Sequence, residues 1–264
     1  MYCKCKENNY MIPKIIHYCW LSNDPIPAKL KKCMDSWKKQ LPDYEFMLWN
    51  FGRFAKGRSV WVSQAFDSRK YAFAADYIRL YALYNYGGIY LDMDVEVLRP
   101  FDSLLGLKTM LCWQKGCDGL EVATFGAEKG SKWVKECLDY YQNREFILHD
   151  GTCSVKPLPN IVEDILRHKG YKLVDCSSIA DAKNTERQYA ERNDSYVLPI
   201  LTDNFFSPRS YDDATTCVTD DTYSIHHFAG TWLPWYSRMK RTVYNSLGLK
   251  NQSPLKMLKD CFGK

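Results

Sequence analysis

Residues 71–86 contain neither glycine nor proline, and large apolar side chains recur among them at the spacing of one helix face. Gly87 and Gly88 follow at once, and glycine tolerates the left-handed backbone that ends helices. Beyond them, residues 89–98 alternate apolar and polar side chains, which is the period of a strand. We therefore expect a buried helix, a glycine turn and a strand in direct succession.

The expected strand 89–98 has two chemically different faces, because successive side chains on a strand point to opposite sides. One face is hydrocarbon and carries Ile89, Leu91, Met93, Val95 and Val97. The other face carries Tyr90, Asp92, Asp94 and Glu96. Asp92 and Asp94 are therefore both placed to approach one hard cation, directly or through a water or a hydroxyl group. The alternative is an acidic pair on the solvent face of an edge strand.

Three further segments have the pattern of an α/β protein. Residues 12–20 and 44–49 are mainly apolar and predict strands, and the polar segment 28–39 between them predicts a helix. Another helix is expected at 161–168, after two prolines. Strand, helix, strand at the start is typical of a Rossmann-like nucleotide-binding domain, in which ligands bind beyond the carboxyl ends of the strands.

Asp76 and Arg79 lie three residues apart on the expected helix, and hence on one face of it, among apolar neighbours. One interpretation is a structural ion pair. The other is a binding pair, in which the carboxylate accepts from hydroxyl groups of a ligand and the guanidinium offers planar donors to an anion. The residues alone leave both interpretations open.

The net charge of +5 is concentrated in a basic C-terminal tail, residues 235–264. Its basic side chains, opposed by Asp260 alone, are Arg238, Lys240, Arg241, Lys250, Lys256, Lys259 and Lys264. Apolar and aromatic residues are interspersed with them, so the tail either lies on an anionic membrane surface or is a solvated terminal helix. Because the excess of positive charge lies in this tail and no nucleic-acid motif is present, we do not expect a nucleic-acid partner.

Cysteine usage and the lack of targeting signals predict the compartment. No run approaches about 18 consecutive apolar residues, and the N-terminus lacks the apolar middle of a signal peptide. The 11 cysteines are scattered and odd in number, and none forms a Cys-x-x-Cys pair, which predicts reduced thiols. We expect a cytoplasmic protein, with peripheral attachment to the inner face of the membrane as a further role of the basic tail.

Four blocks together resemble a known enzyme family. They are residues 17–20 (His-Tyr-Cys-Trp), 74–79 (Ala-Ala-Asp-Tyr-Ile-Arg), 86–94 (Tyr-Gly-Gly-Ile-Tyr-Leu-Asp-Met-Asp) and 227–232 (His-Phe-Ala-Gly-Thr-Trp). In this order they resemble the DXD-containing glycosyltransferases, which include yeast initiating mannosyltransferases, bacterial capsule-synthesis enzymes and the glucosylating domains of clostridial toxins. Together the blocks contain 25 of the 264 residues.

The resemblance implies a GT-A fold, an α/β architecture in which a Rossmann-like domain with a mixed sheet carries a small helical, acceptor-binding part. We expect a single catalytic domain over residues 1–264. Within it, residues 11–110 would form the nucleotide-sugar-binding half and residues 111–234 the half that binds the acceptor and completes the metal site. The basic tail would follow at 235–264.

The resemblance also implies roles for single residues. Trp20 matches an aromatic residue that stacks on the donor base, and Tyr90 matches a tyrosine near the nucleoside. Asp76 and Arg79 match the pair that contacts the donor sugar. Asp92 matches a carboxylate near the ribose and the metal, whereas Asp94 matches a direct metal ligand. The expected donor site further includes Tyr18, Gly230 and Trp232, and the expected catalytic residues are Asp76, Arg79, Asp92 and Asp94.

The C-terminal block implies the third metal ligand. Residues 227–235 resemble a His-x-x-Gly-x-x-Lys-Pro-Trp segment of related retaining galactosyltransferases, whose histidine binds the metal and whose lysine contacts phosphate. His227 is therefore the expected ligand, and the adjacent His226 is expected to point elsewhere. Leu233 departs from that pattern, because it stands where the lysine would neutralise the diphosphate.

The reaction implied is transfer of a hexose-type sugar, with retention of configuration and a divalent cation, Mn²⁺ or Mg²⁺. The donor would be a nucleotide-sugar, by default a UDP-sugar with GDP as the other base. The acceptor would be a glycan or a lipid-linked sugar, as in bacterial surface polysaccharide synthesis. No residue is assigned as a covalent nucleophile, and Asp118, Glu121 and Asp150 are each a possible base or acceptor ligand. The alternatives are a nucleotide-sugar hydrolase or phosphotransferase, and a catalytically silent carbohydrate-binding protein.

Overall fold

The computed structural model describes residues 11–116, 119–192, 194, 196–211, 215–230, 239, 243 and 244. The helices are α1 (Ala28–Gln40), α2 (Val60–Asp67), α3 (Tyr71–Tyr86), α4 (Lys132–Asp139), α5 (Leu158–His168) and α6 (Ile179–Glu191), with short 3₁₀ turns at Lys56–Arg58 and Asp102–Leu104. The strands are β1 (Ile15–Cys19), β2 (Glu45–Trp49), β3 (Gly88–Leu91), β4 (Val95–Val97), β5 (Thr109–Met110), β6 (Thr124–Ala127), β7 (Lys172–Cys176), β8 (Val197–Leu201) and β9 (Ser224–His226). No described helix is both long and apolar enough to cross a membrane, and every described cysteine is free.

The main sheet has five strands in the order β2-β1-β3-β6-β5. Strand β1 is parallel to both β2 and β3, whereas β6 is antiparallel to β3 and to β5. Two small sheets accompany it, an antiparallel pair of β4 and β9 and a parallel pair of β7 and β8. The expected α/β class with a mixed sheet is confirmed.

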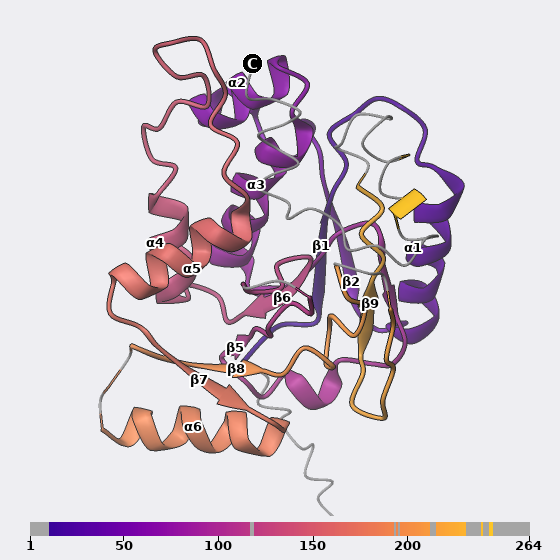
Figure 1. Cartoon of the computed structure of the whole chain (residues 1–264), viewed down its shortest axis with the longest axis vertical. Helices are drawn as coiled ribbons and strands as arrows, with labels where there is room; N and C mark the ends of the chain where they lie inside the picture. The colour runs from indigo at the N-terminus through magenta and orange to yellow at the C-terminus, as the bar shows by residue number, and fades with distance from the viewer. Residues whose placement is uncertain are drawn as a thin grey trace, which may run out of the picture.

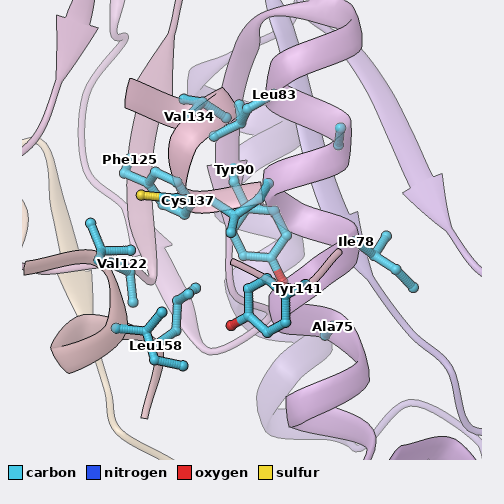
Figure 2. Packing of buried hydrophobic residues seen from close by; sticks show 14 of the residues in the cluster. Ala75, Ile78, Leu83, Tyr90, Val122, Phe125, Val134, Cys137, Tyr141 and Leu158 are labelled. Atoms are coloured by element: carbon cyan, nitrogen blue, oxygen red, sulfur yellow. The ribbon is translucent and has the colours of Figure 1, made fainter. Parts of the chain in front are cut away.

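The sheet separates two apolar cores. Helices α2, α3, α4 and α5 cover one face, and α1 lies on the other side (Figure 1). Neighbouring residues of β3 enter different cores, because their side chains alternate: Tyr90 packs into the first, whereas Ile89 and Leu91 pack into the second. Figure 2 shows Tyr90 and Phe125 of the sheet packed against side chains of α3 and α4 in the first core. Strand β3, the middle strand of the sheet, is thereby held between the two cores.

The single strand expected at 89–98 is wrong, because the structure breaks it after Leu91. The amide of Val95 donates to the carbonyl of Asp92 at 3.0 Å, which closes a turn around Asp92 and Asp94. Beyond this turn the chain leaves the main sheet, and β4 pairs with β9 instead. The alternation of buried and half-buried side chains nevertheless continues to Val97. The acidic pair therefore lies on a turn at the carboxyl end of β3 rather than along a strand.

Other boundaries agree more closely with the sequence. Helix α3 covers the predicted 71–86, and α1 and β2 differ from their predictions by a residue. Strand β1 is shorter than the predicted 12–20. Helix α5 begins at Leu158 instead of residue 161, because proline at the start of a helix loses no hydrogen bond there and Pro159 is accommodated in the first turn.

A glycine junction connects α3 to β3 and fits tightly against β1. Gly87 and Gly88 have φ of 67° and 106°, the left-handed region that favours glycine. A Cβ atom on Gly88 would lie 2.6 Å from the carbonyl oxygen of Ile15. The buried His17 donates from Nε2 to the carbonyl of Gly87 at 2.7 Å and accepts at Nδ1 from the indole Nε1 of Trp49 at 3.1 Å. These contacts fix the exit of α3 onto the sheet.

We expect Gly88→Ala to lower the free energy of unfolding by roughly 3 kcal/mol or more, since it adds both backbone strain and overlap with a backbone carbonyl. Gly57→Ala is the matched control, because a Cβ atom at Gly57 has no neighbour within 4 Å, and its effect should stay within about 0.5 kcal/mol. Urea unfolding of both variants measures the difference. Equal stabilities would contradict the close fit of the junction.

Burial lowers the pKa of His17 from its ordinary 6.5 to about 4, against the opposing hydrogen bond to Gly87. The unfolded chain then binds a proton between these pH values that the folded chain does not. Stability is therefore complete above pH 6.5 and falls as the pH drops toward 4, by about 3 kcal/mol in all. Unfolding free energies at pH 7 and pH 4 should differ less in His17→Gln than in the wild type. Parallel pH profiles would refute this.

Candidate active site

A pocket of about 490 Å³ opens at the carboxyl ends of β1 and β3. These strands are parallel neighbours, so Trp20, directly after β1, and Asp92, directly after β3, lie at the same edge of the sheet. The residues expected from sequence that line the pocket are Trp20, Asp76, Arg79, Tyr90, Asp92, Asp94 and Gly230. Tyr18 is not among the lining residues, because its ring packs edge-on against Trp37 at 5.5 Å. Trp232 lies outside the described residues.

Arg79 is the buried centre of this pocket. Its Nη2 lies 3.3 Å from Oδ1 of Asp76 and 3.2 Å from Oδ1 of Asp92. Its Nη1 donates to the carbonyl of Val122 at 3.0 Å, and its guanidinium carbon lies 4.6 Å from the ring centroid of Tyr90. The ion pair between Asp76 and Arg79 exists, and both side chains also line the pocket. The structural and the binding interpretations of this pair are thus compatible.

Burial raises the pKa of Asp76 to about 7, with Arg79 opposing the rise and the charge of Asp92 adding to it. The carboxyl group is therefore poised between its neutral and charged forms near neutral pH. In the neutral form it donates as well as accepts hydrogen bonds. Such a group suits the hydroxyl groups of a sugar, which also donate and accept.

Three side chains come together at the turn that follows β3. Asp92, Asp94 and His226 each place a ligand atom within 4.8 Å of the others. Tyr90 donates from its hydroxyl to Oδ1 of Asp92 at 3.0 Å, and the amide of Ala229 donates to Oδ2 of Asp94 at 2.7 Å. Two carboxylates and an imidazole are ligands that divalent cations such as Mn²⁺ accept, so the donor set fits the implied metal.

The structure corrects the expected third ligand. His226, and not His227, lies beside the acidic pair, with its Nε2 3.6 Å from Oδ1 of Asp94. The side chain of His227 instead contacts Oε2 of Glu96 at 2.9 Å. The reason is the pairing of β9 with β4, which places His226 opposite Val95, while the side chain of the next residue points to the other face.

The charged groups of this cluster shift one another's pKa values. Burial works against the charge of His226, but Glu121 and Asp94 outweigh it and raise the pKa of His226 to about 10. Burial likewise opposes ionisation of Asp94, but His226 and the amide of Ala229 lower the pKa of Asp94 to about 2. A protonated imidazole of His226 therefore lies between the carboxylates of Glu121 and Asp94.

The C-terminal part of the site lies on a strained turn at residues 228–230. Phe228 has φ of 49°, which is uncommon for a bulky residue, and its ring lies 3.9 Å from that of His226. The turn brings the amide of Ala229 onto Asp94, and Gly230, with φ of 60°, continues it at the pocket wall. Tyr211 packs edge-on against Phe228 at 5.3 Å and also lines the pocket. Sequence reasoning identified neither Tyr211 nor Phe228 as part of the site.

The three carboxylates considered as base or acceptor ligand differ in position. Glu121 lines the pocket but is buried, with only 1% of its surface exposed. Asp150 is exposed, does not line the pocket and accepts hydrogen bonds from Thr152. Asp118 lies outside the described residues. Of the described pair, Glu121 alone is placed to influence the chemistry of the pocket.

Comparison with solved structures gives only distant likeness. A glycosyltransferase named PaToxG matches with a TM-score of 0.45 and 19% identity, over 60% of this chain and 70% of that one. The galactosyltransferase LgtC matches with a TM-score of 0.40 and 12% identity, over 91% of this chain and 98% of the other.

The relatives found by sequence have a higher identity to this chain over the residues that match. Inositol phosphoceramide mannosyltransferase 3 of Schizosaccharomyces pombe is 42% identical over 98 residues, which are 36% of this chain and 27% of the relative. Mannosyl phosphorylinositol ceramide synthase SUR1 of Saccharomyces cerevisiae is 37% identical over 109 residues, 38% of this chain and 27% of the relative. The match therefore spans about a quarter of the length of these two fungal proteins. An uncharacterized glycosyltransferase, L373, of Acanthamoeba polyphaga mimivirus is 25% identical over 85% of both chains.

The family described as glycosyltransferase sugar-binding region containing DXD motif matches residues 27–111. That segment includes Asp76, Arg79, Asp92 and Asp94, the residues that the structure gathers at one end of the pocket. Residues 27–111 of this chain are thus similar to the DXD-containing sugar-binding region of this glycosyltransferase family.

Proposed function

We propose that this chain transfers a hexose-type sugar from a nucleotide-sugar to a glycan or lipid-linked acceptor, using a divalent cation held by Asp92, Asp94 and His226. The observation that carries the proposal is the convergence of these three side chains within 4.8 Å at one end of a pocket that Trp20 also lines. The pocket size also agrees with this class of ligand, because small-molecule sites occupy about 300 to 1,000 Å³.

In this proposal the base of the donor stacks on Trp20. The indole Nε1 of Trp20 donates to the carbonyl of Asp24 at 2.9 Å, so the ring is held in place at the pocket wall. The sugar lies toward Asp76 and Arg79 at the other side of the pocket. Asp76, with its pKa near 7, exchanges hydrogen bonds with sugar hydroxyl groups, while Arg79 keeps that carboxyl in position.

The donor diphosphate lies beside the acidic turn. A bound Mn²⁺ or Mg²⁺ supplies the charge that stabilises the departing nucleoside diphosphate. Arg69 and Lys70, at the start of α3, line the same pocket and add positive charge. We infer that these cations, together with Arg79, supply what the lysine replaced by Leu233 would otherwise contribute.

We further propose that the sugar keeps its anomeric configuration. Asp76 is engaged by Arg79, and Asp92 by Arg79 and Tyr90, so these two carboxylates are already hydrogen-bonded or ion-paired. Attack by the acceptor from the face of the leaving group, with a phosphate oxygen taking the proton, requires no covalent nucleophile from the protein. This route uses the protein only to hold the donor and the cation, through Asp76, Arg79 and the acidic turn.

The acceptor class is supported by the relatives, two of which are named for mannosyl transfer to inositol phosphoceramide, a lipid. We propose a lipid-linked or glycan acceptor, with surface polysaccharide synthesis as the setting expected from the sequence. In the same proposal the enzyme is cytoplasmic and its basic tail contacts the inner face of the membrane. A donor hydrolase is the alternative that shares this metal site.

The direct test is a panel of UDP-sugars and GDP-sugars, mannose donors included, with nucleotide release as the measurement. We expect Mn²⁺ to be required, EDTA to abolish turnover, and a lipid or glycan acceptor to accelerate release. Full activity in EDTA would refute the metal. Release that no acceptor accelerates would favour the hydrolase.

Asp94→Asn should lower turnover by on the order of a hundredfold or more, because it weakens a ligand of the cation that stabilises the leaving group. Asp150→Asn is the matched control, since Asp150 is an exposed carboxylate away from the pocket. Steady-state rates are compared after thermal melts confirm that both variants fold. Equal rates for the two variants would rule out a metal role for Asp94.

Trp20→Ala should weaken nucleotide binding by about 1 to 3 kcal/mol, the scale of stacking between a base and an aromatic ring. Trp20→Phe keeps a stacking surface and should retain most of the affinity. Calorimetric titration with the nucleoside diphosphate measures both variants. If Trp20→Ala folds and binds like the wild type, Trp20 has only a packing role.

A further inference from the structure

Glu121 is a buried acid to which the proposed reaction gives no direct step. It precedes β6, and 1% of its surface is exposed. Its Oε1 accepts from the amide of Ala123 at 2.7 Å, and its Oε2 lies 3.2 Å from Nδ1 of His226. Both oxygens of this carboxylate are therefore engaged, one by the backbone and one by the histidine.

This pairing determines which nitrogen of His226 keeps its hydrogen when the other nitrogen binds a cation. An ionised carboxylate only accepts hydrogen bonds, so Nδ1 must be the donor to Glu121. The other ring nitrogen, Nε2, then faces the acidic turn, 3.6 Å from Oδ1 of Asp94. A histidine that donates from one nitrogen to a carboxylate and offers the other to a cation is the usual arrangement in protein metal sites.

We propose that Glu121 is the positioning residue that fixes the orientation and the protonated nitrogen of His226, so that Nε2 joins Asp92 and Asp94 as a cation ligand. The inference rests on the proposed metal site and adds to it a residue outside the DXD turn. Glu121 touches neither the cation nor the substrate in this role. It acts through the imidazole ring.

The segment that carries Glu121 is well suited to this task, because its backbone also holds the other site residues. The carbonyl of Val122 accepts from Arg79 at 3.0 Å, and the carbonyl of Ala123 accepts from the amide of Asp92 at 2.8 Å. Glu121 thus connects the turn containing His226 to the segment that already fixes Arg79 and Asp92. Movement of this segment would displace the ligands together.

A neighbouring pair supplies an internal control. His227 contacts Glu96 at 2.9 Å in a second glutamate–histidine pair, but this pair is partly exposed, and neither side chain belongs to the group of Asp92, Asp94 and His226. Removing the negative charge of Glu96 therefore tests a glutamate–histidine contact that plays no part in the proposed site.

The experiment measures Mn²⁺ affinity of the full chain by the electron paramagnetic resonance signal of free Mn²⁺. We expect Glu121→Gln to weaken binding by roughly 10-fold to 100-fold, the usual cost of losing such a partner. The glutamine carbonyl would keep the bond to Ala123, so its NH₂ group would face Nδ1 and move the ring proton to Nε2. His226→Ala should weaken binding at least as much, and Glu96→Gln should leave it unchanged.

A second measurement uses the wild type, so it tests the role of Glu121 even if Glu121→Gln does not fold. With ¹⁵N-labelled histidine and saturating Mg²⁺, the long-range ¹H–¹⁵N spectrum should show His226 protonated at Nδ1 and not at Nε2. Protonation at Nε2 would overturn the inference. Unchanged Mn²⁺ affinity in His226→Ala would defeat the metal site itself, whereas weak binding in His226→Ala with normal binding in folded Glu121→Gln would defeat only the role of Glu121.

Discussion

The burial of one cation, Arg79, constrains the rest of the site. A buried guanidinium is tolerated only where acceptors surround it. Here the acceptors come from three parts of the chain: Asp76 on the same helix, Asp92 at the end of β3, and the carbonyl of Val122. Its Nε atom still has no described hydrogen-bond partner. The cation therefore holds the acidic turn, the helix and the segment before β6 together.

The glycine junction explains why Arg79 can reach these acceptors. Helix α3 turns back onto the sheet eight residues after Arg79, and the left-handed backbone of Gly87 and Gly88 makes this possible. Gly126, across the sheet, is equally constrained, because a Cβ atom there would lie 2.9 Å from the carbonyl of Gly88. The glycines on β3 and β6 thus allow the close packing of these strands beneath Arg79.

Local patterns in the sequence predicted the elements next to the acidic turn and several residues that line the pocket. The helix 71–86, the glycine turn and the pairing of Asp76 with Arg79 depend on residues near one another in the chain, and the structure has them. Asp92 and Asp94 were predicted to share a face, and they do approach one point, although on a turn. That turn escaped prediction because the alternation of burial continues through it while the pairing partner changes from the main sheet to β9. Local pattern carries no information about such a change.

The choice between His226 and His227 illustrates the same limit. Adjacent residues on a strand point to opposite faces, so the assignment depends entirely on the register of β9 against β4. No local signal in the sequence sets that register. The role of Glu121 was equally hidden, since its partner is 105 residues away along the chain. The resemblance implied that His227 would face the acidic pair and that His226 would point elsewhere, and the structure has the two side chains the other way round.

The docking of β9 on β4 also has a consequence for synthesis on the ribosome. The main sheet, α3 and the acidic turn are complete once about half of the chain has emerged, but the amide that holds Asp94 and the imidazole beside it belong to residues 226–229. Because domains generally fold as units, neither the pocket nor the cluster of Asp92, Asp94 and His226 can form before these residues are present, since residues 157–159 and 211 also line the pocket. The site is therefore completed late in synthesis, when β9 pairs with β4.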